Sequence, residues 1–411
     1  MKVESIRVKN FKVFKEMSVS ALSSFSVFLG VNGAGKSALF QIFGFLADAL
    51  RTNVTTAINN QGGFHEVITR GTPLNQAIEF VVRFRDRKEN GETPLVTYEL
   101  KIGWENQKAV VLWEVLKHRR DRSSVKPWNF LMFQRGRGYV INNEGDIGAS
   151  GAREQRDDLA LESADRLAIK GSGALKRYQA ITDFRNFIEG WRLLDLQDEA
   201  LGMPCSSGAE RRLASTGSNL AQATKLLQDQ DPEQFKKVLA KMSQRFSGLE
   251  DIKTAKTKSG QIQLQFKDEA YIDAIPASSI SSGILRMCAY LVLCHDPFPF
   301  SLLFIEEPER HLHPDSIPTL AKELREYARR GCQVFVSTHS PAFVNFVLPS
   351  ELHFVRKKSG GSLLARADHD PKLKARVASG HRLGNLWQRG LIAIGEDETS
   401  DKNEAEPSPM A

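Results

Sequence analysis

The chain has 411 residues, of which 41% are hydrophobic and 26% are charged, and its formal net charge is +7. This composition is ordinary for a soluble globular protein, and the length allows two or three domains with a full-sized core. The sequence contains no apolar stretch as long as a membrane span, and residues 1–6 alternate polar and apolar side chains, so we expect a first β-strand there and not a signal peptide. The charge permits a polyanionic partner without requiring one. The cysteines, Cys205, Cys288, Cys294 and Cys332, show no metal-ligand spacing. Buried thiols in a reducing compartment are therefore expected, and we predict a cytoplasmic protein.

The N-terminal segment predicts two strands followed by a phosphate-binding loop. Residues 1–22 are expected to form a strand, a turn at 10–12 and a second strand. Residues 30–37, Gly-Val-Asn-Gly-Ala-Gly-Lys-Ser, match G-x-x-x-x-G-K-[ST] at every fixed position. The apolar run 24–29 predicts a buried strand before the loop, and 38–50 predict a helix after it. This is the strand–loop–helix context that the motif requires, and it disfavours the alternative of a glycine turn with a chance Lys-Ser pair.

The chemistry of this loop indicates nucleotide binding. Its glycines allow backbone N–H groups to surround a phosphate chain, and the following helix adds partial positive charge at its N-terminus. Lys36 is expected to reach the β- and γ-phosphates of ATP, and Ser37 to bind Mg²⁺. The predicted nucleotide-binding residues of this segment are Asn32, Gly33, Ala34, Gly35, Lys36 and Ser37.

The middle of the chain predicts an antiparallel sheet and then a helical segment. Apolar and polar residues alternate in 77–87, 95–104 and 109–117, as in strands, whereas 118–172 are polar and irregular. From 173 the period becomes helical, with helices expected at 175–191, 218–228 and 232–246. Ser218 or Thr216 is expected to cap the second helix, and Pro232 lies in the first turn of the third. A further strand is expected at 262–266.

Two buried strands are predicted to bring acids and a histidine to one edge of a sheet. Residues 301–308, Ser-Leu-Leu-Phe-Ile-Glu-Glu-Pro, predict a parallel strand that ends in two carboxylates. Glu306 could hold Mg²⁺ through water and Glu307 could polarise the attacking water, although the same pattern also fits a strand that stops at two surface acids. A second strand, 332–337, delivers His339 to the same edge, where it could contact the γ-phosphate or serve as a capping or core histidine.

A run of hydroxyl side chains opens the helix expected at 284–294. Residues 278–283 read Ser-Ser-Ile-Ser-Ser-Gly. Hydroxyls and a glycine at a helix N-terminus form an anion site, but taken alone they are also a good N-cap. The candidate nucleotide-binding residues here are Ser281, Ser282 and Gly283.

Together these segments resemble the ABC-type ATPase heads of the RecF/SMC branch. The likeness is strongest to the compact ATPases related to RecF and to the overcoming-lysogenization-defect (OLD) proteins, a group often found in phage-defence systems. It rests on 6–12 as the opening strand and turn, 30–37 as Walker A, and 280–286 as a variant signature. It also rests on 304–314 as Walker B with the following D-loop, 337–341 as the switch-histidine segment, and 384–390 near the C-terminus. The resemblance covers roughly residues 1–395, thinly in the middle.

The resemblance implies an α/β P-loop NTPase fold: an ABC-type head with a mixed central sheet, an added antiparallel sheet and a helical insert. Residues 396–411 are acidic, contain proline and have almost no apolar residues, so their composition predicts a disordered acidic tail. The resemblance divides the rest of the chain into an ATPase lobe (1–172), a helical insert (173–275), and the signature, Walker B and switch-histidine part of the core (276–395). It also implies a homodimer, or a higher oligomer, in which each ATP is held by one subunit's Walker loop and the other's signature serine, Ser281.

The sequence departs from the family pattern at three places. The first Walker B acid is Glu306 where most ABC heads have Asp, although the related compact ATPases share this. The signature has Ser282 where many ABC proteins have Gly. The expected position of the Q-loop, 165–171, contains no glutamine.

Three functions are compatible with these features. The first is a Mg²⁺-dependent ATPase that acts as an ATP-gated dimeric switch in a bacterial anti-phage defence complex and controls a separate effector, such as a nuclease or toxin. The second is a RecF-like DNA-binding ATPase of repair or recombination, for which basic segments at 117–122, 135–137, 356–358 and 372–376 could line a surface for double-stranded DNA. The third, a transporter ATPase, is disfavoured because no membrane segment is predicted. No carboxylate cluster of a nuclease domain follows the ATPase, which favours a separate effector.

Overall fold

The computed structural model describes residues 1–86, 94–119, 127–143, 155–172, 178–208, 211–358 and 361–392. Within these residues the strands form three sheets, of eight, six and three strands. The result confirms the predicted α/β class, with a mixed central sheet, an added antiparallel sheet and helices. No helix in the described part of the chain combines the length and the apolar character that a membrane crossing needs. The predicted acidic tail, 396–411, lies outside the described residues.

The eight-stranded sheet has the order β2-β1-β4-β5-β6-β7-β8-β9, and every neighbouring pair is antiparallel. Alternate residues of β4, including Phe80, Val82 and Phe84, are buried, so one face of this sheet covers a core. Its strands are β1 (Lys2–Phe11), β2 (Phe14–Ser20), β4 (Ile78–Arg85), β5 (Leu95–Glu105), β6 (Lys108–Arg119), β7 (Trp128–Gln134), β8 (Arg137–Ile141) and β9 (Arg156–Ala160).

The six-stranded sheet is the central one and has the order β10-β14-β15-β3-β16-β17. All of its neighbours are parallel except β16 and β17. The carboxyl ends of β3, β14 and β15 therefore meet at one edge, as the sequence predicted. Its strands are β3 (Phe25–Leu29), β10 (Trp191–Leu194), β14 (Leu302–Glu306), β15 (Gln333–Thr338), β16 (Leu352–Lys358) and β17 (Gly361–Arg366).

Helix α1 (Lys36–Arg51) lies between the two large sheets and is buried along both sides. Toward the central sheet, the ring centroid of Phe43 is 4.7 Å from that of Phe304 on β14. Toward the antiparallel sheet, Phe45 stacks on Phe80 of β4 with ring centroids 5.6 Å apart. Because aromatic rings on opposite sides of α1 are fixed by both sheets, the loop that precedes this helix is held in place.

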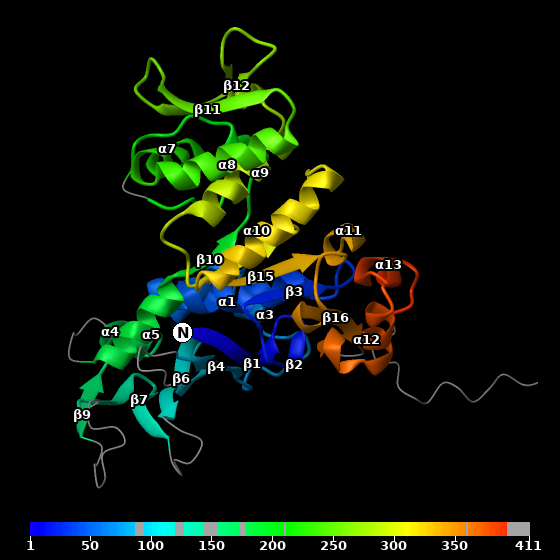
Figure 1. Ribbon diagram of the computed structural model, residues 1–411. Coiled ribbons are helices and arrows are strands. Elements are labelled where there is room, and N and C mark those ends of the chain that lie inside the picture. Colours follow the sequence, from blue (N-terminus) through cyan, green and yellow to red (C-terminus); the bar gives the residue numbers. More distant parts are fainter. Residues whose placement is uncertain are drawn as a thin grey trace, which may run out of the picture.

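A third group of elements stands apart from the two large sheets, at the top of Figure 1. It consists of α7 (Leu220–Gln230), α8 (Pro232–Arg245), β11 (Leu249–Lys256), β12 (Ile262–Asp268) and β13 (Ile275–Pro276), which we call the insert. Helices α9 (Ser282–His295) and α10 (Ile317–Arg329) connect it to the central sheet. The boundaries drawn at 172 and 275 stay a prediction.

The remaining helices are short. They are α2 (Val54–Asn60), α3 (Phe64–Val67), α4 (Ala168–Ser172), α5 (Gln179–Glu189), α6 (Asp198–Leu201), α11 (Pro341–Val344), α12 (Pro371–Ala378) and α13 (Leu383–Gln388). Single 3₁₀ turns lie at Ala277–Ser279, Pro314–Ser316, Pro349–Glu351 and Ala367–His369.

Several element predictions were wrong. The segment 118–172, expected to be irregular, contains β7, β8, β9 and α4. The helix expected at 175–191 ends at Glu189, and Trp191 instead begins β10, which pairs with β14. The N-cap of α7 is Asn219 and not Ser218 or Thr216. The Asn219 side chain accepts a hydrogen bond from the Ala214 N–H, so it fixes the preceding loop. Strand β11 was not predicted.

Candidate active site

The loop Gly30–Ser37 joins β3 to α1 and depends on its glycines. Gly33 and Gly35 have φ values of 77° and 106°, in the left-handed region that favours glycine, and Gly35 is the N-cap of α1. A Cβ atom on Gly30 would lie 2.5 Å from the carbonyl oxygen of Val355 on β16. The backbone of this loop therefore requires glycine at three positions, as a phosphate-binding loop does.

Lys36 is buried at the start of α1 and folds back over the loop. Its Nζ donates to the carbonyl oxygens of Gly30, at 2.7 Å, and Val31, at 3.2 Å. Burial lowers the pKa of Lys36, and the negative charges of three acids, Glu307, Glu306 and Glu309, act in the opposite direction. The lysine is thus one cation held by the loop and facing several carboxylates.

Ser37 and Glu306 come together from α1 and the end of β14. The Ser37 hydroxyl donates to Oε2 of Glu306 at 2.9 Å. Burial raises the pKa of Glu306, and the charges of Asp195 and Glu307 add to that effect. Hydroxyl and carboxylate oxygens are ligands that Mg²⁺ accepts, usually with substrate phosphates completing the set. Ser37 and Glu306 supply two such oxygen atoms, so the remaining ligands of a Mg²⁺ ion bound here would come from phosphate groups and water.

Glu307, the next residue, pairs with His339. Nδ1 of His339 lies 2.7 Å from Oε1 of Glu307. The Glu307 backbone has a positive φ of 46°, and its N–H donates to the Ser337 carbonyl at 2.8 Å. A non-glycine residue in this conformation is held by its surroundings, and such strain is common at functional sites. The two adjacent acids therefore serve different partners, as their place at a strand end predicted.

A third acid, Glu309, lies behind this pair. Its carboxylate accepts a hydrogen bond from the Thr338 hydroxyl, and burial raises its pKa. Its other oxygen, Oε2, is buried and makes no hydrogen bond within the described part of the protein. Glu309 lies three residues after the end of β14, but its contact with Thr338, the residue before His339, is seen only in the folded structure.

Ser281, Ser282 and Gly283 lie at the start of α9, as predicted. Ser281 is the N-cap of that helix, is exposed, and its side chain makes no capping hydrogen bond. A Cβ atom on Gly283 would lie 2.6 Å from the carbonyl oxygen of His311, so this glycine allows the D-loop to approach the helix. Helix α9 packs against α6, α7, α8 and α10. The first turn of α9 therefore lies against the D-loop, and the helix as a whole is held by the four helices around it.

Asp195 is a residue that sequence reasoning missed. It directly follows β10, and because Leu194 pairs with Ile305 of β14, Asp195 lies beside Glu306 at the same sheet edge. Its charge contributes to the raised pKa of Glu306. Residues 165–171, where a Q-loop was expected, lie between β9 and the end of α4. Asp195 was missed because the short strand before it, Trp191–Leu194, follows α5 almost directly in the sequence and is predicted as the end of that helix.

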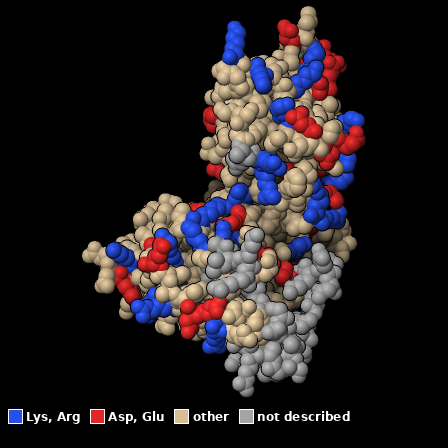
Figure 2. All heavy atoms as spheres, turned by 90° about the vertical axis from the view of Figure 1, so that its left-hand side faces the viewer, with Lys and Arg blue, Asp and Glu red and all other residues tan. Residues whose placement is uncertain are grey.

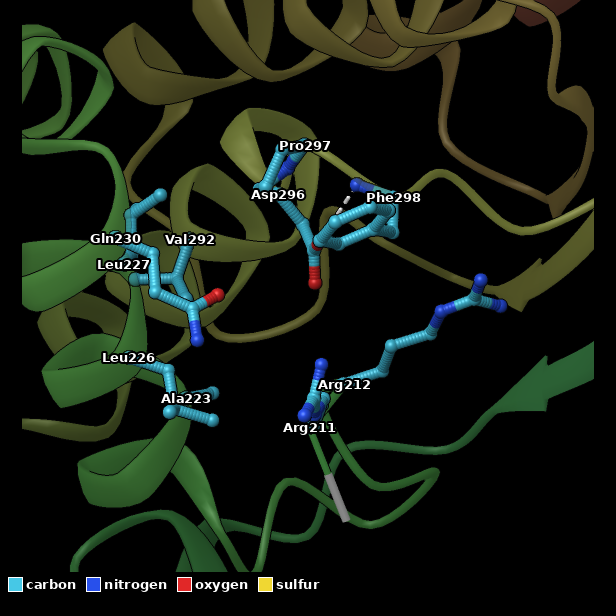
Figure 3. Close-up of a pocket in the computed structure, with 10 residues that line it drawn as sticks. All are labelled: Arg211, Arg212, Ala223, Leu226, Leu227, Gln230, Val292, Asp296, Pro297 and Phe298. Carbon is cyan, nitrogen blue, oxygen red and sulfur yellow. Dashed lines mark hydrogen bonds between the residues drawn. The ribbon is translucent and has the colours of Figure 1, made fainter.

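A pocket lies away from this edge, between α7 and the segment that follows α9. Figure 3 shows Asp296 and Phe298 on one side of it and the side chains of Arg211 and Arg212 on the other. Burial raises the pKa of Asp296. The pocket has a volume of about 170 Å³ and contains none of the predicted site residues. It is lined by Arg211, Arg212, Ala223, Leu226, Leu227, Gln230, Val292, Asp296, Pro297 and Phe298.

Two family models match the chain. One, described as "AAA ATPase domain", matches residues 1–128, and the other, described as "AAA domain, putative AbiEii toxin, Type IV TA system", matches residues 144–345. Among solved structures, the chain is similar to an SMC head bound to the C-winged helix domain of ScpA, with 13% identity, a TM-score of 0.53, and coverage of 89% of this chain and 98% of that one. The fold is that of an ABC-type ATPase head. The two family matches and this likeness in fold together support an ATPase domain with the fold of an SMC head.

Two further SMC heads are similar over most of their length. The SMC head domain from Thermotoga maritima has 13% identity and a TM-score of 0.43, over 89% of this chain and 99% of that one. The Smc head domain from Pyrococcus furiosus, bound to the C-terminal domain of ScpA, has 14% identity and a TM-score of 0.48, over 92% and 99%. A search of curated proteins finds no match.

Proposed function

We propose that the protein is an ATP-gated dimeric switch that hydrolyses ATP with Mg²⁺ and controls a separate effector. The observation that carries this proposal is the meeting of Ser37 with Glu306, and of Glu307 with His339, at one sheet edge beside Lys36. These are the groups that phosphoryl transfer to water needs: a cation for the phosphates, oxygen ligands for a metal, and a base for the water.

The reaction is the attack of water on the γ-phosphorus of ATP. A bond forms between the water oxygen and the phosphorus, and the bond from phosphorus to the oxygen that bridges to the β-phosphate breaks. Glu307 accepts the water proton on its carboxylate, and His339 orients that carboxylate through Oε1. Lys36 and the backbone N–H groups of Asn32–Ser37 hold the phosphates. Ser37 and Glu306 would hold Mg²⁺, which would supply positive charge to the phosphate oxygens.

The dimer completes the site. Ser281 is exposed at the start of α9, and one chain has one set of motifs, so a second copy would bring its Ser281 to the γ-phosphate held by the first. The N-terminus of α9 adds partial positive charge at that point. ATP bound between two copies then holds them together, and hydrolysis releases them.

The experiment compares two variants. Glu307→Gln should bind ATP but hydrolyse it at least ~10²-fold more slowly, since the loss of a general base has that size. Light scattering should show this variant associating when ATP is added. Adding Ser281→Arg should abolish the ATP-dependent part of that association while ATP still binds to the single subunit. Unchanged turnover in Glu307→Gln would remove the base assignment, and unchanged association in the double variant would refute the shared site.

We propose an effector of the nuclease or toxin class, in a bacterial anti-phage defence complex. The support is the family description that names a toxin and a toxin–antitoxin system, together with the resemblance of the motifs to OLD-related ATPases. Co-expression of the protein with the product of its neighbouring gene is the test. ATP-dependent toxicity or nuclease activity, absent with Lys36→Ala, would support the proposal; a neighbour devoted to replication would favour the RecF-like alternative.

The alternative, a DNA-binding repair ATPase, requires a basic surface. Of the predicted basic segments, Lys117 pairs with Glu99 at 2.6 Å and Arg135 pairs with Glu105 at 2.8 Å, while residues 120–122 lie outside the described part. Figure 2 shows Lys and Arg mixed with Asp and Glu over the described part of one face. A duplex titration at low and moderate salt, with and without ATP, tests this alternative. Binding that strengthens with ATP would support it.

A further inference from the structure

Asp198, the first residue of α6, makes two strong contacts with different elements. Its Oδ1 accepts from Nε of Arg286 on α9 at 2.5 Å, and its Oδ2 lies 2.6 Å from Nδ1 of His311 in the D-loop. Burial acts to raise the pKa of Asp198, but the hydrogen bonds and charges of Arg286 and His311 lower it. The carboxylate is thus held as an anion between the signature helix and the D-loop.

Arg286 fixes the other side of this junction. Only 6% of Arg286 is exposed, and its second nitrogen, Nη2, donates to the Leu196 carbonyl at 2.7 Å. Arg286 lies one helical turn after Ser282, on the first turns of α9. The arginine therefore ties the start of the signature helix to the short segment 195–198, which begins beside Glu306.

The D-loop is joined to the same helix by a second contact. His311 has a positive φ of 63°, and its carbonyl oxygen lies against Gly283, where any Cβ would clash. The Arg310 N–H donates to the carbonyl oxygen of Glu307 at 2.9 Å, so the turn that carries His311 starts at the proposed catalytic base. The Asp198 carboxylate thus lies where the signature helix, the D-loop and the segment after β10 meet.

We infer that Asp198 is a positioning residue that couples the signature serine to Glu307. This inference rests on the proposed function. Asp198 holds the helix that presents Ser281 to the partner copy and the turn that follows Glu307 as one unit. A movement of either on ATP binding by the partner is thereby transmitted to the other. Asp198 itself lies outside the phosphate-binding loop and makes no contact with Lys36 or Ser37 that the described structure records.

The variant Asp198→Ala tests the coupling, with Glu199→Ala as a matched control. Glu199 is the next residue of α6 and is exposed. Asp198→Ala should leave the Kd for ATP of the single subunit within about 2-fold but lower kcat by at least ~10-fold, since misplacement by about 1 Å can cost 10²-fold. On the Glu307→Gln background it should weaken ATP-dependent association. The control should match the parent in all three measurements.

A second variant separates positioning from folding. Because Asp198→Ala leaves Arg286 buried without its anion, the double variant Asp198→Ala/Arg286→Met removes that charge as well. It should recover thermal stability but not kcat, because the connection is still missing. If kcat returned with stability, Asp198 would be only a structural partner of Arg286 and the inference would be wrong.

Hydrogen exchange decides the inference even if the wild-type protein does not hydrolyse ATP. Without nucleotide, Asp198→Ala should raise exchange in peptides covering 281–286 and 308–313 together, and Glu199→Ala in neither. Faster exchange in only one of the two segments would refute the coupling. A wild-type protein that neither hydrolyses ATP nor associates as Glu307→Gln would instead refute the proposed function.

Discussion

Glu114→Gln is expected to remove a pH dependence of stability that the wild-type protein carries. Glu114 lies on β6 and is fully buried. Its Oε2 accepts from the Ala168 N–H at 2.5 Å, and its Oε1 accepts from the Ile169 N–H and the Tyr98 hydroxyl, both at 3.1 Å. Burial raises the pKa of Glu114 from its ordinary value of 4.5 to about 7, against the effect of these hydrogen bonds.

The magnitude follows from the difference between the two values. Because 7 − 4.5 is about 2.5 and each pKa unit corresponds to about 1.4 kcal/mol, the contribution is on the order of 3 kcal/mol. The folded state binds the proton more tightly, so the contribution is fully present below pH 4.5 and is lost as the pH rises to about 7. The free energy of unfolding should therefore fall by roughly this amount across that window.

The assay is urea denaturation of wild type and Glu114→Gln at pH 5, 6, 7 and 8, followed by intrinsic tryptophan fluorescence, to which Trp104, Trp113 and Trp128 of the same sheet contribute. The wild type should lose stability relative to the variant as the pH rises. Glu99→Gln, which removes a partly exposed acid on β5 paired with Lys117, is the control and should keep the wild-type slope. Parallel curves for wild type and Glu114→Gln would refute the assignment.

Glu114 is also connected, through α4, to the helix that begins at the nucleotide-binding loop. Glu114 holds the start of α4, and Lys170 of α4 donates to the carbonyl oxygens of Arg51 and Thr52, both at 2.7 Å. These carbonyls are at the C-terminus of α1, the helix that begins at Lys36, where a cation is favourable.

Two further predictions concern the nucleotide loop and the insert. Lys36→Ala should weaken ATP binding about 10- to 100-fold in calorimetry, which is the cost of losing a hydrogen bond to a charged group. Gly30→Ala should also weaken binding, with Lys36 intact, because its Cβ would meet the Val355 carbonyl oxygen. Normal affinity in both variants would exclude this loop as the ATP site. Lys241→Met should lower the free energy of unfolding by about 2–3 kcal/mol, because Glu323, 8% exposed, then loses its lysine and keeps only His295, 3.3 Å away, beside its carboxylate. Lys225→Met, which breaks an exposed pair, should change it by less than about 1 kcal/mol, and equal effects would contradict this account.

The sequence predicted which side chains meet at this sheet edge because the motifs that carry them are local. Each motif follows a buried apolar strand or opens a helix, and strand ends in a parallel sheet converge by geometry. Glu306 could therefore be placed near Ser37, and His339 near Glu307, without any knowledge of the rest of the fold.

The missed elements have little local signal. Strand β9 reads Arg-Asp-Asp-Leu-Ala, lies at the edge of its sheet, and has no fully buried residue, so no apolar alternation marks it. Strand β10 has four residues and follows a helix with only Gly190 between them; its conformation is set by pairing with β14. Asp198 could not be predicted, because its partners, Arg286 and His311, are 88 and 113 residues away in the sequence.

The insert lies in the chain between two parts of the proposed switch, the sheet edge with Glu306 and the signature serine Ser281. It is connected on one side to the end of β10, beside Glu306, and on the other to Ser281 at the start of α9. Helix α9 has 14 residues, about 21 Å at 1.5 Å per residue.

Helix α9 is held at both ends. Asp198 and His311 hold its first turns through Arg286. At its last residue, His295 lies 2.8 Å from Gln234 and 3.1 Å from Lys241 of α8. Because α9 is held at both ends, we expect part of a displacement of α8 to be transmitted along the helix to Ser281. An effector docked on the insert could thus respond to ATP-driven closure, and affect it in return, without any contact with the nucleotide.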